Sequence, residues 1–154
     1  MTSRSGVEPT LSRGRPQLRM DWLVSRSLIL GLIIVDLSEL REVRIDSGMQ
    51  LAYAQGGATW EDFDKATTAA GFVGVGGTVN HTGIGGLILG GGYGYLTGQY
   101  GLAIDNLVEA TMVVADGRIV KTSKEENPDL FWGIRGTAHQ MSRLTGQVEA
   151  ATLA

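Results

Sequence analysis

The feature that most constrains the fold of this chain is a glycine-rich segment at its centre. Residues 71–101 contain 13 of the 23 glycines in the 154-residue sequence. Flexible linkers combine glycine with serine and lack aliphatic residues, whereas residues 74–94 interleave glycine with valine, isoleucine and leucine. We therefore expect a packed segment. Glycine there would let the backbone take positive φ or approach a ligand closely, and consecutive N–H groups would form an anion-binding concavity.

Two familiar phosphate-binding loops do not match the spacing of these glycines. A P-loop requires Gly-Lys followed by Ser or Thr, and the sequence contains no Gly-Lys pair. The Rossmann fingerprint requires glycines at i, i+2 and i+5, but the i+5 residues of the Gly-x-Gly pairs are Val79, Ile88, Tyr95 and Thr97. A purely structural glycine turn and an anion-binding loop of another kind both stay open at this point.

Composition excludes several other classes of protein. The absence of cysteine removes disulfides, thiolate zinc sites, iron–sulfur clusters and a cysteine nucleophile. The net charge of −3 and the pI of about 5.3 argue against a nucleic-acid partner. The longest apolar run, residues 28–35, is too short to span a membrane. No pair of histidines lies near carboxylates at ligand spacing, so we expect no metal site.

Hydrophobic periodicity predicts a chain of mixed helices and strands. Thr59 with Asp62 three residues later predicts a capped helix start, and Asn127 before Pro128 predicts another. Residues 1–21 are polar and aperiodic, and we expect them to be disordered or mis-assigned; residues 137–154 show no strand signal. The expected strands are residues 32–35, 43–46, 50–55, 107–115 and 118–120, and the expected helices are 57–71 and 128–136.

Five motifs in one order resemble the flavin-binding core of the FAD-linked oxidases. The resemblance is to the p-cresol methylhydroxylase or vanillyl-alcohol oxidase type, in the berberine-bridge-enzyme and 6-hydroxynicotine-oxidase branch, and fungal members are most similar. With a looser fit over residues 33–75, it covers about two thirds of the chain. The motifs are TGIGG at 82–86, GGGYG at 90–94, YGLAIDN at 100–106, VVADG at 113–117 and NPDLFWGIRG at 127–136.

This resemblance implies an α+β fold, in which residues 22–136 form part of an FAD-binding domain with two α+β subdomains and FAD between them. Residues 137–154 would be an unmatched tail. The implied chemistry is oxidation of an alcohol, sugar or amine carbon of a small-molecule substrate with oxygen as acceptor, without nucleic-acid or membrane partners. The residues implied to bind the cofactor are Gly77, Thr78, Asn80, Thr82, Gly83, Ile84, Gly85, Gly86 and Val113.

The sequence also departs from the family pattern. The Arg-x-Gly-Gly-His phosphate loop expected before residues 32–35 has no counterpart, and no histidine precedes His81. We therefore expect FAD to be non-covalent if bound, and the chain to be an excerpt with both ends altered. Two alternatives remain: a non-catalytic remnant with weak or no FAD binding, and a phosphate-binding module without redox chemistry.

No residue is assigned a catalytic role. His81 could be a flavin-proximal polar group, but a loop histidine bonded to main chain is favoured. Asp105 and Asn106 are expected to order a turn. Tyr93, Tyr95 and Tyr100 could equally line a pocket or pack the loop down.

Overall fold

The computed structural model describes residues 24–27, 32–136 and 147–153, which fall in two compact units, residues 1–36 and 37–154. In the first unit, β1 (Val24–Ser27) and β2 (Leu32–Val35) form an antiparallel hairpin. The strand expected at residues 32–35 is therefore present. The expectation for residues 1–21 lies outside the described residues.

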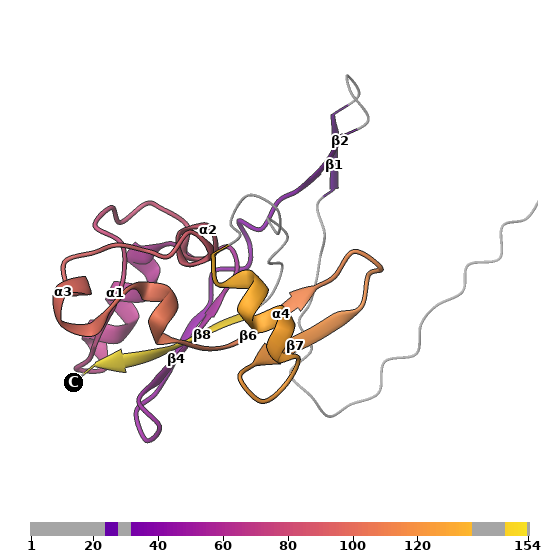
Figure 1. Cartoon of the computed structure of the whole chain (residues 1–154). Helices are drawn as coiled ribbons and strands as arrows, with labels where there is room; N and C mark the ends of the chain where they lie inside the picture. Colours follow the sequence, from indigo (N-terminus) through magenta and orange to yellow (C-terminus); the bar gives the residue numbers. More distant parts are fainter. Residues whose placement is uncertain (1–23, 28–31, 137–146, 154) are drawn as a thin grey trace, which may run out of the picture. The chain divides into compact units, whose positions relative to one another are not determined.

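The second unit is built on an antiparallel sheet, shown in Figure 1. Its strand order is β3-β4-β8-β6-β7, and β5 pairs with β8 outside this path. The strands expected near residues 43–46, 50–55, 107–115 and 118–120 all form, with ends shifted by a few residues. The bounds are β3 (Val43–Asp46), β4 (Leu51–Gln55), β5 (Val73–Gly74), β6 (Leu107–Val113), β7 (Ile119–Ser123) and β8 (Gln147–Leu153).

The central strand β8 corrects the expectation that residues 137–154 contain no strand. β8 pairs with β4 over five residues, from Leu51↔Ala151 to Gln55↔Gln147, and with β6 on its other side. Its sequence, QVEAATL, lacks the β-branched alternation that signals a strand. Partners on both sides supply backbone hydrogen bonds that the local sequence does not reveal, since strand formation depends strongly on tertiary context.

The longest helix is α1 (Trp60–Ala69), and it begins as predicted at a capping box. Thr59 and Asp62 bond reciprocally, and Gly71 at φ +83° follows the helix end. The helix is shorter than the expected 57–71 because Gly57 lies in the turn before it. The shorter helices that follow are α2 (Ile84–Leu89), α3 (Thr97–Tyr100), a 3-10 helix (Ala103–Asn106) and α4 (Pro128–Ile134). Helix α4 packs on β7.

Asn127 precedes α4 but does not cap it with its side chain. Its backbone is left-handed, with φ 51° and ψ 53°, and its Nδ2 donates to the Lys121 carbonyl at 2.6 Å instead. The predicted helix start is therefore right, whereas the predicted cap bond is wrong.

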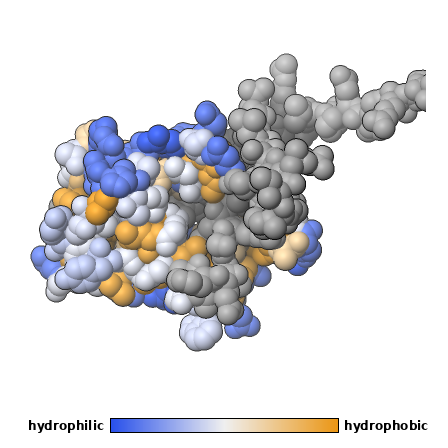
Figure 2. Space-filling model, turned by 90° about the horizontal axis from the view of Figure 1, so that it is seen from above, coloured by the Kyte–Doolittle hydropathy of each residue, from blue (hydrophilic) through white to orange (hydrophobic). Residues whose placement is uncertain are grey.

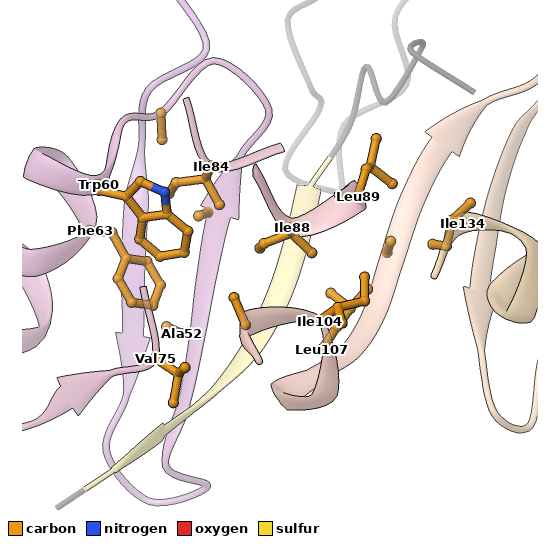
Figure 3. Packing of buried hydrophobic residues seen from close by; sticks show 14 of the residues in the cluster. Ala52, Trp60, Phe63, Val75, Ile84, Ile88, Leu89, Ile104, Leu107 and Ile134 are labelled. Atoms are coloured by element: carbon orange, nitrogen blue, oxygen red, sulfur yellow. The ribbon is translucent and has the colours of Figure 1, made fainter. Parts of the chain in front are cut away.

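A single apolar cluster fills the space between the sheet and these helices (Figure 3). Trp60 and Phe63 of α1 meet edge to face with ring centroids 5.4 Å apart. Both rings are almost completely buried, as are Ile84 and Ile88 of α2. Burial of a large aromatic or aliphatic side chain stabilises a fold by about 1.5–3 kcal/mol. The core therefore holds α1 and α2 firmly against each other.

Candidate functional site

Several glycines in the central segment are required by packing. A Cβ at Gly74 would lie 2.1 Å from the Phe63 ring, and one at Gly76 would lie 2.5 Å from the Trp60 ring. A Cβ at Gly94 would lie 1.7 Å from the Gly76 carbonyl oxygen. The chain segments at 76 and 94 thus cross in direct backbone contact, which only glycine permits. At Gly74, Gly76 and Gly94, the packing of the chain is therefore sufficient to explain why the residue is glycine.

The loop between β5 and α2 is fastened to the start of α1. The Trp60 N–H donates to the Thr82 carbonyl at 3.1 Å, and the Glu61 N–H donates to the Asn80 carbonyl at 2.8 Å. The Ile84 N–H donates to the Ala58 carbonyl at 3.0 Å. These bonds satisfy N–H groups that a helix start leaves without internal acceptors, and they fix the path of residues 80–84.

Three glycines beside this loop have no packing reason to be glycine. A Cβ at Gly83 or Gly86 would meet no atom within 4 Å, and one at Gly85 would only reach ordinary contact with the Gly56 carbonyl oxygen at 3.7 Å. None of the three has a positive φ, so the expected need for left-handed backbone is wrong here; it holds instead at Gly91, Gly92 and Gly101.

The main-chain donors of two of these glycines, Gly83 and Gly86, are available to a ligand, whereas Gly85 is buried. Gly83 is the N-cap of α2 and makes no side-chain cap bond. Gly85 and Gly86 lie in the first helical turn, where N–H groups find no acceptor inside the helix. Gly83 and Gly86 are also exposed. A bulky anionic group, such as the pyrophosphate of a dinucleotide, fits residues 83–86 because no side chain blocks its approach to the N–H groups.

The structure brings eight of the nine residues implied to bind the cofactor onto this one loop and the start of α2. Thr78, Asn80, Gly83 and Gly86 are exposed, and Thr82 is half-buried. Ile84 and Gly85 are buried, so they act through the backbone or through packing. Gly77 packs against Leu87 and Trp60. Val113 lies elsewhere, paired with Ile119 at the end of β6.

Asp105 and Asn106 order the turn after α3, as their residue types predict. Asp105 Oδ2 accepts from the Leu102 N–H at 2.9 Å, and Asn106 Nδ2 donates to the Tyr100 and Leu102 carbonyls at 3.1 and 2.9 Å. The Arg135 guanidinium lies 3.2 Å from the other Asp105 oxygen.

Tyr93 and Tyr95 do not pack the loop down. Their side chains are 75% and 89% exposed, while Gly92 and Gly94 are buried. The buried glycines therefore make the packing contacts of this segment, and the two tyrosine side chains are exposed. Figure 2 shows one face of the molecule, on which apolar residues lie in small groups among polar ones.

Asp62 holds the cap of α1, next to the residues that anchor the loop. Partial burial would raise the pKa of Asp62, but hydrogen bonds from the Thr59 N–H and hydroxyl and the Arg41 guanidinium together lower it below the usual 3.8. Arg41 makes two bonds to the carboxylate, Nε to Oδ2 at 3.0 Å and an Nη2 bond to Oδ1 at 2.9 Å. This network fixes the chain at residue 41 to the helix that carries the loop.

Beneath the loop, one buried donor has no acceptor. Trp60 Nε1 is the single such buried side-chain atom in the part of the chain with described side chains, residues 36–136. A donor left unpaired in a protein interior costs about 1–3 kcal/mol. The ring that carries it lies against Gly76 and Gly77. No sequence signal marks this residue beyond its place in the α1 core pattern.

Among the residues that the structure describes, no cluster of acidic, histidine or cysteine side chains could hold a metal ion. Within the same residues, no helix has the length and apolarity to cross a membrane.

Comparison with known proteins places this fold among flavin-binding domains. The FAD binding domain family matches residues 23–123. An FAD-linked oxidoreductase, pgmH of Aspergillus terreus, is 48% identical over 113 residues, which are 73% of this chain and 23% of that protein. The chain therefore belongs to the FAD binding domain family, and its cofactor is FAD. It spans about a quarter of the length of the curated relatives that it matches.

Two solved structures share the fold. The 6-hydroxy-D-nicotine oxidase of Arthrobacter nicotinovorans is 36% identical with a TM-score of 0.73, over 77% of this chain and 26% of that one. The glucooligosaccharide oxidase of Acremonium strictum is 35% identical with a TM-score of 0.70, over 75% of this chain and 24% of that one. The second carries a 6-S-cysteinyl, 8α-N1-histidyl FAD, whereas the present sequence contains no cysteine.

Proposed function

We propose that this chain is the FAD-binding portion of an oxidase that acts on an alcohol, sugar or amine carbon of a small molecule, with oxygen as acceptor. The observation that carries the proposal is the open backbone at the exposed Gly83 and Gly86, where an anionic group can reach main-chain donors. When bound, FAD supplies hydride and electron chemistry, and the protein supplies binding and orientation.

Each residue of the loop has a role in this proposal. The N–H groups of Gly83 and Gly86 hold the pyrophosphate, because backbone donors bind phosphate without a fixed cation, and the buried Gly85 keeps the start of α2 free of side-chain bulk. Thr78, Asn80 and Thr82 offer polar side chains along the same loop. Ile84, which is buried, anchors α2, and Gly77 lets the loop pass over Trp60. Val113 meets the adenine end through its main chain.

In this proposal the FAD-binding portion extends over residues 22–136. Residues 137–154 do not match the five motifs, but β8 within them supplies the strand between β4 and β6.

A second candidate is a non-catalytic remnant of the domain that binds FAD weakly or not at all. Its support is the absence of an Arg-x-Gly-Gly-His loop before residues 32–35.

A titration of the purified chain distinguishes these functions. Flavin fluorescence anisotropy would be followed as protein is added to FAD, with ADP and inorganic pyrophosphate as competitors. Saturable FAD binding that ADP displaces only weakly supports the proposal. No binding supports the remnant, and equal binding of FAD and pyrophosphate supports a phosphate module.

A further inference from the structure

A tight turn at Asp116 and Gly117 joins β6 to β7, the last strand of the sheet (Figure 1). The Val114 N–H donates to the Arg118 carbonyl at 2.9 Å, and the Gly117 N–H donates to the Val114 carbonyl at 2.8 Å. A three-residue loop with a left-handed glycine is a common hairpin connection, and Gly117 has φ +85°. This turn therefore requires a glycine directly after Asp116.

The same pair of residues can react with itself. Asp116 and Gly117 are both exposed, and a Cβ at Gly117 would meet no atom within 4 Å, so no side chain shields the Gly117 nitrogen. That nitrogen can attack Cγ of a protonated Asp116 carboxyl group. The new N–Cγ bond closes a five-membered succinimide ring, and the amide proton leaves with the carboxyl hydroxyl as water. Water then opens the ring, and opening at the main-chain carbonyl yields isoaspartate without any other reactant.

Arg118 opposes this reaction by holding both carboxylate oxygens of Asp116. Its main-chain N–H donates to Oδ1 at 3.0 Å, and its Nε donates to Oδ2 at 2.7 Å. These hydrogen bonds from Arg118 lower the pKa of Asp116, whereas ring closure consumes the protonated carboxyl group. The guanidinium is the part of this restraint that a substitution can remove, because the main-chain N–H remains in every variant.

We propose that Asp116-Gly117 is a site of isoaspartate formation and that the Arg118 guanidinium slows the reaction there. This inference does not depend on FAD binding. Isoaspartate adds one methylene group to the main chain inside the turn, where the bond between Val114 and Arg118 closes the hairpin. The modification therefore lengthens the turn and weakens the neighbouring pair, Val113↔Ile119.

The test compares the full chain with Arg118→Ala and with Lys121→Ala, a control that removes a cation from the same strand, where it pairs with Glu109 instead of Asp116. All three are incubated for weeks at neutral pH and digested, and liquid chromatography with mass spectrometry separates the isoaspartyl peptide from its isomer of equal mass. Two synthetic peptides that cover residues 112–122, with and without the Arg118→Ala substitution, are incubated alongside as unfolded references.

Isoaspartate at residue 116 should form about threefold to tenfold faster in Arg118→Ala than in the unchanged chain, the range expected for one lost hydrogen bond between exposed charged groups. Lys121→Ala should react as the unchanged chain does, and the two peptides should react faster than the folded chain and at equal rates.

Three results would overturn the inference. They are no isoaspartate at residue 116 in any of the chains, equal rates in Arg118→Ala and the unchanged chain, and an acceleration of the same size in the peptides, which would assign the effect to local sequence instead of the folded turn. The Arg118 side chain is exposed, so Arg118→Ala should fold. Arg118→Gln, which keeps a long side chain without the charge, takes its place if it does not.

Discussion

Gly76 and Gly86 lie ten residues apart in one segment, but a methyl group added to each would have opposite consequences. At Gly76 it would collide with the Trp60 ring, whereas at Gly86 it would enter open space. The first glycine is required by the fold. The second is not required by the packing of the described chain, and the proposed function assigns it to the close approach of the cofactor.

This contrast yields a prediction for Gly86→Ala. Alanine is the better helix former, so the free energy of unfolding should stay level or rise by up to about 1 kcal/mol. FAD affinity should nevertheless fall about tenfold or more, because the methyl keeps phosphate oxygens from the N–H groups. Urea unfolding and anisotropy titration measure the two effects.

The matched control for Gly86→Ala is Gly98→Ala in α3, where a Cβ also meets nothing within 4 Å. It should leave FAD affinity unchanged. Equal affinities of the two variants would show that residues 83–86 do not form the cofactor wall.

The Asp62 carboxylate gives a pH-dependent prediction. Since its folded-state pKa lies below 3.8, its contribution to stability is present above that value and is lost as the pH falls through the folded pKa. Asp62→Asn keeps an acceptor for Thr59 but removes the ion pair with Arg41. It should lower the free energy of unfolding by about 1–2 kcal/mol at pH 7, and the difference should vanish once the pH has fallen below the lowered folded-state pKa of Asp62.

Urea unfolding at several pH values checks this prediction, with Glu61→Gln as control. Glu61 pairs with Lys65 at the surface, and such exposed pairs contribute less than about 1 kcal/mol. A constant difference between Asp62→Asn and the unchanged chain from pH 7 to pH 2 would contradict the assigned role of the carboxylate.

Helix α1 links the fold to the candidate site, and the sequence revealed most of it. Thr59 and Asp62 gave the helix start, and the Trp60 and Phe63 spacing gave its buried face, because caps and periodicity depend on nearby residues. The bonds from Trp60 and Glu61 to the carbonyls of residues 80–82 were not predictable, since they join segments twenty residues apart. The unpaired Trp60 N–H escaped prediction for the same reason.

Strand β8, unlike α1, could not be predicted from its own sequence. Nothing in QVEAATL signals a strand, but its backbone is paired with β4 and β6. Proline in a central strand removes a ladder hydrogen bond. Ala150→Pro should therefore destabilise the chain by about 3 kcal/mol or more, measured as a lower urea midpoint.

The control for Ala150→Pro is Ile119→Pro, at the first residue of the edge strand β7, a position where proline is tolerated better. Equal urea midpoints for Ala150→Pro and the unchanged chain would mean that β8 does not contribute to the stability of the sheet.

At the scale of the whole molecule, the first prediction concerns how FAD is held. The sequence contains no cysteine, and no histidine precedes His81. We therefore expect no counterpart here of the 6-S-cysteinyl, 8α-N1-histidyl link that the glucooligosaccharide oxidase of Acremonium strictum carries. After acid precipitation of the FAD-loaded chain, all yellow colour should stay in the supernatant. Flavin that remains in the washed pellet would show a covalent link, and peptide mapping would then identify the residue.

The second whole-molecule prediction is that this 154-residue chain, taken by itself, has no enzyme-like turnover. Oxidation by a flavin needs a substrate carbon held against the ring and a group placed to take a proton. On the loop of residues 77–86 the one titratable side chain is His81, which is exposed. The chain also spans about a quarter of its relatives. Hydrogen peroxide release from the FAD-supplemented chain, measured with sugars, alcohols and amines, should equal that of free FAD. Substrate-dependent release well above this level would show that one wall of the flavin site is enough for catalysis, and His81→Ala would then test whether that histidine takes the proton.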